Sequence, residues 1–191
     1  MKEIMVPLAP GFEELEAVTI IDLFRRVPEV RVTTASISDN LQVTGSHEIT
    51  IFADQIFSGD RNLDRVFDLI VLPGGMPGTL NLVNNKELMS IVKDQVESDR
   101  LCAAICAAPA FLVENGVIGA DRYVTCYPTM KDKIKDKHYL NREVVVDRNL
   151  ITGRGPGAAI PFVLALLESL CGKGCSDNLS KSLQYASEDS I

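Results

Sequence analysis

Two short runs of apolar residues constrain the fold of this chain more than any other feature. Residues 67–72 form one near-continuous run, and residues 101–105 form the other. Runs of this length are typical of strands that are covered on both faces, as in parallel sheets. Each run ends at small or turn-forming residues and is followed by a helix-forming stretch. The pattern predicts two strand-to-helix turns at the carboxyl edge of a buried parallel sheet.

Similar segments continue through the rest of the chain. We expect further strands at 4–8, 30–36, 123–126, 143–146 and 150–152. Residues 41–43 and 48–52 are expected to form a hairpin or edge pair. Helices are expected at 12–26, 85–98, after 107 and at 158–170. In the first helix the residues near a 3.6 period are Leu15, Val18, Thr19, Asp22 and Leu23. We expect a polar loop at 61–65 and a frayed tail from Ser187. Alternating strands and helices predict an α/β fold with a mostly parallel central sheet and helices on both faces. With 191 residues and no linker, the chain is expected to form a single domain over residues 1–191.

Charge and composition exclude several classes of function. The net charge of −7 argues against binding to nucleic acid or to anionic membranes. No apolar run is long enough to span a bilayer. The chain begins directly with a strand-like run, so we expect no signal peptide. Five cysteines, an odd number, then favour free thiols in a reducing compartment, and we expect a cytoplasmic protein.

Cysteines four residues apart raise the question of a zinc site. Such spacings occur twice, but only two histidines could complete a ligand set, at His47 and His138. We therefore expect no structural zinc. Similarly, the glycine-rich segment 153–157 is not followed by Gly-Lys-Ser/Thr, so it is not expected to be a phosphate-binding P-loop.

Cys106 lies at the junction between the apolar run 101–105 and the helix-forming stretch 107–114. Small residues flank it on both sides, and Pro109 is tolerated in the first helical turn. This pattern is typical of a nucleophile elbow, a sharp strand-to-helix turn that presents one side chain. A thiol there would face the positive end of a helix dipole, which favours the thiolate. The alternative is an ordinary buried cysteine that acts as a small hydrophobic residue.

Two further features point to the same edge of the sheet. Glu16 lies in the first helix, close to the end of the first strand, whereas Glu13 and Glu14 are interpreted as ordinary acids of a helix N-terminus. Gly74 and Gly75 follow the run 67–72 and expose backbone N–H groups. They form either a simple turn or an anion-binding loop.

Five motifs together carry a resemblance to a known family: Gly11-Phe-Glu-Glu-Leu-Glu16-Ala, Val71-Leu-Pro-Gly-Gly75, Ala103-Ala-Ile-Cys106-Ala-Ala-Pro109, Pro128-Thr-Met-Lys-Asp-Lys133 and Gly153-Arg-Gly-Pro-Gly157. The chain resembles the DJ-1/ThiJ/PfpI superfamily, and within it the DJ-1 branch, which includes the oxidative-stress protein linked to parkinsonism and its bacterial relatives. The motifs span nearly the whole chain. The resemblance implies a flavodoxin-like three-layer α/β sandwich and a homodimer.

The resemblance also implies roles for individual residues. Cys106 matches the reactive, oxidation-sensitive cysteine, which is held in a strained backbone conformation, and Glu16 matches the acid that hydrogen-bonds its sulfur. The implied oxyanion hole consists of the N–H groups of Gly75 and Ala107. Arg26, with Gly74, is implied in an anion pocket near the cysteine at the dimer interface.

The chain departs from the family pattern at two positions. Tyr127 stands where many relatives carry a histidine near the cysteine, and His47 stands where some carry a second interface arginine. His138 lies in a different segment. A Cys-His pair like that of the protease members therefore cannot be assembled at position 127, and proteolysis is not expected.

Three functions remain open from the sequence. In the first, peroxide oxidises Cys106 to sulfinate while a protonated Glu16 donates to the sulfur, and the thiol pKa is expected to lie below about 7. In the second, which the family implies, the protein is a cofactor-independent glyoxalase or deglycase. Cys106 then forms a hemithioacetal with small reactive carbonyls such as methylglyoxal. The third is a redox-regulated chaperone role. None of these functions requires a cofactor.

Overall fold

The computed structural model describes residues 1–58, 66–134 and 138–185. The polar loop predicted at 61–65 and the tail predicted from Ser187 lie outside the described residues. Within the described residues, no helix is both long and apolar enough to cross a membrane.

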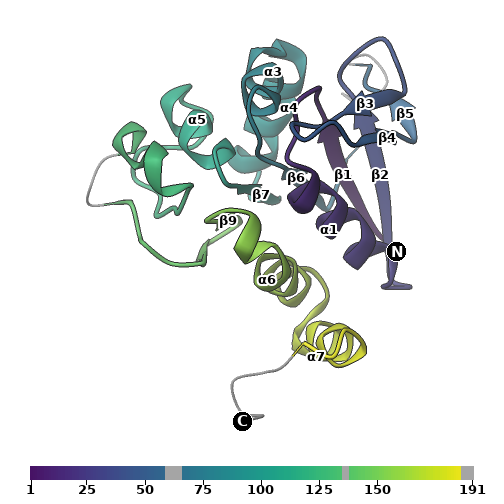
Figure 1. Cartoon of the computed structure of the whole chain (residues 1–191). Coiled ribbons are helices and arrows are strands. Elements are labelled where there is room, and N and C mark those ends of the chain that lie inside the picture. The colour runs from purple at the N-terminus through teal and green to yellow at the C-terminus, as the bar shows by residue number, and fades with distance from the viewer. Residues whose placement is uncertain (59–65, 135–137, 186–191) are drawn as a thin grey trace.

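A seven-stranded sheet forms the middle layer of the molecule (Figure 1). Its strands, from one edge to the other, are β5 (Gln55–Ile56), β2 (Val30–Ser36), β1 (Lys2–Leu8), β6 (Leu69–Leu72), β7 (Leu101–Ile105), β9 (Leu150–Gly153) and β8 (Val144–Asp147). The pairs are parallel except that β8 runs antiparallel to β9. A separate antiparallel ribbon joins β3 (Gln42–Thr44) to β4 (Thr50–Phe52).

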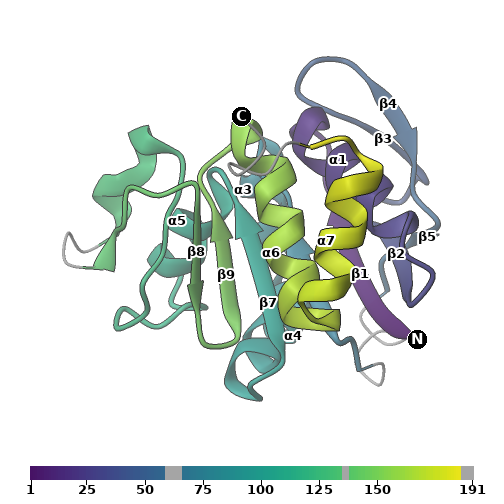
Figure 2. The ribbon, with the colours of Figure 1, turned by 90° about the horizontal axis from the view of Figure 1, so that it is seen from below.

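Helices cover both faces of this sheet, which gives three layers (Figures 1 and 2). One face carries α1 (Glu14–Arg25), α6 (Ala159–Cys171) and α7 (Lys173–Ser182), and the other carries α3 (Gly78–Asn84), α4 (Lys86–Glu97) and α5 (Ala108–Glu114). Two 3₁₀ turns, η1 (Pro128–Lys133) and η3 (Pro156–Ala158), lie in connecting segments.

The two faces of each central strand belong to different hydrophobic cores. In β7, Ala103 and Ile105 pack with α1 and α6, whereas Cys102 and Ala104 pack with α4 and α5. Successive side chains of a strand point to opposite faces, so a strand covered on both sides must be apolar throughout. This explains the continuous apolar runs and confirms the predicted flavodoxin-like α/β sandwich.

One sequence-based prediction about elements is wrong, and two helices were missed. Residues 123–126 do not form a strand of the sheet; Val124 makes one isolated bridge with Tyr139. The N–H of Thr125 instead donates to the Thr152 hydroxyl at 2.9 Å, and β8 pairs with β9 at that edge. Also, α3 and α7 were not predicted, because each is short and lacks a clear apolar period.

The buried face of α1 also differs from the predicted one. Leu15 and Val18 are 54% and 43% exposed. The core side of the helix is instead formed by Ala17, Ile20 and Phe24, together with other buried residues. These positions are themselves spaced by three or four residues, so the helical period was right, but of the five predicted residues only Leu23 is buried. Two large apolar side chains are thereby left at the surface.

Candidate active site around Cys106

Three adjacent strands end at the same place on the carboxyl edge of the sheet. β1, β6 and β7 are neighbours in the sheet. Glu16 lies in the first turn of α1, Gly74 and Gly75 follow β6, and Cys106 follows β7. In open α/β sheets this edge is where ligands bind. The fold therefore brings together three segments that are far apart in the sequence.

Cys106 occupies a sharp turn between β7 and α5. Its φ angle is +64°, in the left-handed region, which costs an L-residue about 1–2 kcal/mol. Two backbone hydrogen bonds hold it there. The Cys106 N–H donates to the Gly153 carbonyl at 3.0 Å, and the Tyr127 N–H donates to the Cys106 carbonyl at 2.7 Å. The strained conformation is thus fixed by β9 and by the segment that follows α5.

Gly74 allows the Glu16 carboxyl to approach Cys106. Its N–H donates to Oε2 of Glu16 at 2.8 Å. A Cβ atom at Gly74 would lie 2.5 Å from the Cβ of Cys106 and 2.8 Å from Oε2 of Glu16, so a side chain does not fit. Glu16 is fully buried. Its Oε1 has no nitrogen or oxygen partner among the described residues, while the Cys106 thiol hydrogen-bonds to the carboxyl.

Burial shifts both acids toward their protonated forms. It raises the pKa of Glu16 to about 7, although the Gly74 N–H and the thiol oppose the shift. Burial and the Glu16 charge also raise the pKa of the Cys106 thiol, against hydrogen bonds from the N–H groups of Gly75 and Ala107. The predicted lowering of the thiol pKa to below about 7 is therefore wrong in direction. The helix N-terminus does favour the thiolate, but desolvation and a neighbouring carboxylate outweigh it.

The other predicted residues around the sulfur also lie here. Both backbone N–H groups of the expected oxyanion hole, at Gly75 and Ala107, hydrogen-bond to the sulfur. Gly75 has a φ of +93°, and a Cβ there would collide with the Glu13 backbone nitrogen. The Tyr127 ring lies beside Gly155, where a Cβ would be 3.2 Å from Cδ2 of the ring. Tyr127 is a partly exposed neighbour of the cysteine backbone.

Comparison with known proteins agrees with this geometry. The model of the DJ-1/PfpI family matches residues 2–169. The chain belongs to the DJ-1/PfpI family.

Individual DJ-1/PfpI proteins resemble the chain over most of its length. It is 37% identical to DJ-1 homolog B of Arabidopsis thaliana over 94% of this chain, and it spans only 40% of the length of that relative. It is 39% identical to glutathione-independent glyoxalase DJR-1.2 of Caenorhabditis elegans, over 64% of this chain and 66% of the relative. The solved structure of oxidized Toxoplasma gondii DJ-1 superposes with a TM-score of 0.92 at 32% identity, covering 98% of this chain and all of that one.

Within a single chain of this DJ-1/PfpI protein, Arg26 does not lie beside Cys106. It follows Glu16 by ten residues, which is about 15 Å along a helix. Its guanidinium instead pairs with Asp22 at 2.9 Å, on the exposed side of α1. Only a second chain could bring Arg26 to Cys106, so its place in an anion pocket at a dimer interface stays a prediction.

Two further residues, His138 and Cys126, lie in other surroundings. The His138 ring packs against Tyr123, with ring centroids 5.3 Å apart. Cys126 is buried in the core on the α4 and α5 side, whereas Cys106 belongs to the core on the α1 and α6 side. Cys126 and Cys106 thus lie in different hydrophobic cores.

Glu14 has a structural role that the sequence reasoning missed. It is buried and accepts hydrogen bonds from the His47 N–H at 2.6 Å, from Nδ1 of His47 at 2.9 Å and from the Ile49 N–H at 3.3 Å. Burial opposes its ionisation, but these hydrogen bonds outweigh burial and lower its pKa to about 2. Its position in a first helical turn looks ordinary, so no signal in the sequence identified it.

Glu13, Glu14 and His47 form the one group of three or more potential metal ligands found among the described residues. Their ligand atoms lie within 4.8 Å of one another. The hydrogen bond to Glu14 and the charges of both carboxylates raise the pKa of His47, which favours a protonated ring. A protonated imidazole pairs with carboxylates and does not bind a metal. We therefore interpret the cluster as a group of ion pairs that connects α1 to the β3–β4 ribbon.

Proposed function

We propose that this protein is a cysteine-based oxidative-stress response protein whose reactive centre is Cys106. The observation that carries the proposal is the contact between Cys106 and a fully buried Glu16 whose pKa is about 7. At neutral pH such a carboxyl holds its proton for much of the time and can donate it to sulfur. A carboxylate would instead repel the thiolate.

Oxidation proceeds in two steps that each consume one hydrogen peroxide. The thiolate attacks one peroxide oxygen, the O–O bond breaks, and a sulfenate and water are formed. A second peroxide adds a second oxygen and gives the sulfinate. Protonated Glu16 and the N–H groups of Gly75 and Ala107 then donate to the product, and such charge-assisted hydrogen bonds are shorter and stronger than neutral ones.

Intact-mass measurement after graded peroxide treatment tests this proposal. We expect the wild type to gain two oxygens at Cys106 and Cys106→Ser to lose that gain. Glu16→Gln keeps a donor beside the sulfur through its amide, so it is expected to be oxidised more slowly rather than not at all. Equal oxygen uptake by Cys106→Ser and wild type would contradict the proposal.

A second candidate is a glyoxalase that needs no glutathione. One relative carries this activity in its name, and the Glu16 pKa of about 7 suits a group that both accepts and donates a proton. The Cys106 sulfur adds to the aldehyde carbon of methylglyoxal, and the N–H groups of Gly75 and Ala107 stabilise the resulting oxyanion.

Proton transfer between carbons completes the reaction. Ionised Glu16 removes the hydrogen from the former aldehyde carbon and returns it to the neighbouring carbonyl carbon. The hemithioacetal thereby becomes a thioester, which water hydrolyses to lactate and free thiol. Glu16→Gln cannot accept this proton, so lactate formation should fall at least about 100-fold, the usual contribution of a general base.

The two candidates therefore make different demands on Glu16. If Glu16→Gln forms lactate at the wild-type rate, the glyoxalase mechanism is wrong even if peroxide oxidation of Cys106 is observed. If Cys106→Ser still forms lactate, the hemithioacetal step is wrong.

A further inference from the structure

A pair of thiols lies where α6 meets α7, on the helical layer that also contains α1 (Figure 2). Cys171 is the last residue of α6, and Cys175 lies in the first turn of α7. Between them Gly172 adopts a φ of +89°, which breaks the helix. The Ser176 hydroxyl donates to the Leu164 carbonyl at 3.0 Å and fixes the start of α7 on α6.

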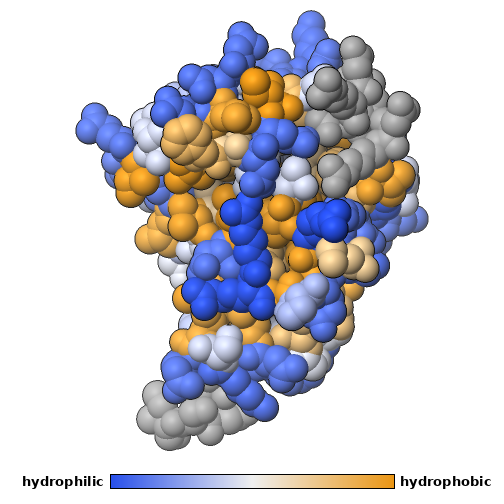
Figure 3. Space-filling view, turned by 90° about the vertical axis from the view of Figure 1, so that its right-hand side faces the viewer, coloured by the Kyte–Doolittle hydropathy of each residue, from blue (hydrophilic) through white to orange (hydrophobic). Residues whose placement is uncertain are grey.

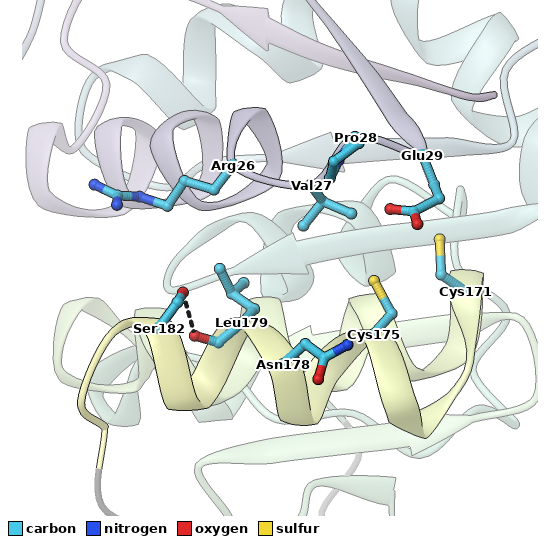
Figure 4. Close-up of a pocket in the computed structure, with 9 residues that line it drawn as sticks. All are labelled: Arg26, Val27, Pro28, Glu29, Cys171, Cys175, Asn178, Leu179 and Ser182. Atoms are coloured by element: carbon cyan, nitrogen blue, oxygen red, sulfur yellow. Dashed lines mark hydrogen bonds between the residues drawn. The ribbon is translucent and has the colours of Figure 1, made fainter.

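The two thiols line the same hollow. Its volume is about 420 Å³, and its other walls include Val27, Glu29 and Leu179. Figure 4 shows both sulfur atoms pointing from the two helices toward the Val27–Glu29 segment. Each thiol affects the pKa of the other.

Exposure separates this pair from the remaining cysteines. Cys171 and Cys175 are partly exposed, Cys106 keeps 9% of its surface exposed, and Cys102 and Cys126 are fully buried. A thiol reacts with a solution oxidant only when the oxidant can reach it. Of the five cysteines, these two combine access to solvent with a thiol partner close at hand.

We propose that Cys171 and Cys175 form a second oxidation site, a dithiol that hydroperoxides convert into an intramolecular disulfide. The geometry of the helix junction supports closure. A short segment containing Gly172 and Gly174 separates the cysteines, and a Cβ at either glycine would meet no atom within 4 Å. The backbone therefore has room for the small adjustment that an S–S bond requires.

The surroundings assign the order of the two steps. The neighbouring thiol lowers the pKa of Cys175 and raises that of Cys171, so the thiolate is favoured at Cys175 over Cys171. Cys175 attacks peroxide, the O–O bond breaks, and a sulfenic acid and water form. The Cys171 sulfur then attacks the Cys175 sulfur and displaces the hydroxyl, which leaves as a second water. Two thiols lose two electrons in total, and one hydrogen peroxide is reduced.

Nearby charges set the sensitivity of this site. Burial and the carboxylate of Glu29 raise the pKa of both thiols, and Lys2 lowers that of Cys171. Arg26 also lines the hollow. Because Glu29 disfavours both thiolates, we expect this dithiol to respond only to stronger or longer oxidation.

Peptide mapping gives a direct test with the full-length chain. Lys173 lies between the two cysteines, so trypsin cleavage there separates them unless a disulfide joins the peptides. After peroxide treatment and blocking of free thiols, we expect a linked peptide pair whose mass is lower by two hydrogens and which dithiothreitol separates. The result should be the same in the wild type and in Cys106→Ser, so this test does not depend on the function proposed for Cys106.

Charge-neutralising variants test the assigned environment. Glu29→Gln should speed formation of the linked pair by about two- to threefold, because a larger thiolate fraction is partly offset by its lower nucleophilicity. Glu168→Gln serves as the matched control, since the acidic groups acting on these thiols do not include Glu168, and its rate should be unchanged. The proposal would be overturned if, after oxidation, the blocking reagent still labelled both cysteines as free thiols. It would also be overturned if one cysteine gained oxygen and no linked pair formed.

Discussion

At the scale of single residues, the site places two acids with raised pKa values, Cys106 and Glu16, side by side. Cys106 and Glu16 are in contact; burial raises the pKa of both groups, and the Glu16 carboxylate raises that of the thiol further. Such a pair titrates as a unit, and its first proton is lost near the Glu16 pKa of about 7. The remaining proton can stay on the thiol or move to Glu16. Only the second arrangement holds a thiolate, and there the protonated carboxyl, Gly75 and Ala107 all donate to the sulfur.

This arrangement predicts an unusual pH dependence for alkylation of Cys106 by iodoacetamide. Below about pH 7 the rate should rise about tenfold per pH unit, because the singly protonated pair becomes more abundant. Above pH 7 the rate should level off, since moving the remaining proton between the two groups does not depend on pH. Single-cysteine mass mapping measures this rate.

Glu16→Gln is the control for this profile. Without the second acid, the break near pH 7 should disappear and the rate should keep rising with pH as an ordinary thiol ionises. If wild type and variant share one profile, the pair does not share its proton.

At the scale of elements, the β3–β4 ribbon is held to α1 by Glu14. The carboxylate accepts N–H groups of the ribbon turn at His47 and Ile49. Position 45 has room only for glycine, because a Cβ at Gly45 would collide with the Glu14 side chain. The hydrogen bonds lower the pKa of Glu14 from 4.5 to about 2 despite its burial. The first turn of α1, which also carries Glu16, is thereby fixed against the ribbon.

Replacing this carboxylate should destabilise the protein in a pH-dependent way. We expect Glu14→Gln to lower the free energy of unfolding by about 2 kcal/mol at pH 7, the usual value for hydrogen bonds to a charged group. Because the folded pKa lies below the unfolded one, this contribution is complete above about pH 4.5 and is lost as the pH falls toward 2. Urea unfolding between pH 2 and 7 measures the difference.

Glu87→Gln is the matched control, since Glu87 is also an acid in a first helical turn but is exposed. Its effect should stay within about 0.5 kcal/mol. A Glu14→Gln effect that is equally small, or that persists at pH 2, would contradict the role of the carboxylate.

At the scale of the whole molecule, apolar side chains gather between α1 and the β3–β4 ribbon. The exposed members are Leu15, Val18, Ile49 and Phe52, and two hollows run between them. The side of the molecule that carries the ribbon shows apolar patches among charged side chains (Figure 3). Exposed apolar side chains gathered among charged ones are typical of a protein–protein interface. We therefore place the predicted homodimer interface here.

A charge placed in this patch should weaken self-association. We expect Val18→Glu to raise the dimer dissociation constant at least about tenfold, equivalent to about 1.4 kcal/mol, because the new carboxylate would be buried without a partner. Light scattering behind size-exclusion chromatography, over a dilution series, measures the change. Val146→Glu, at an exposed position on β8, should leave the dissociation constant unchanged. A monomeric wild type, or equal effects of both variants, would contradict the placement.

The sequence by itself determined which strands are buried and that Cys106 lies at a strand-to-helix turn, because strands covered on both faces must be apolar and turns after them need small residues. The runs at 67–72 and 101–105 and the glycines at 74 and 75 follow from those local rules. Only the tertiary structure decided which face of α1 is buried, what Glu14 contacts, and that Cys171 and Cys175 share a hollow. It also reversed the expected shift of the Cys106 pKa. Desolvation and side-chain partners depend on residues far away in the chain, and these come together only when the layers pack.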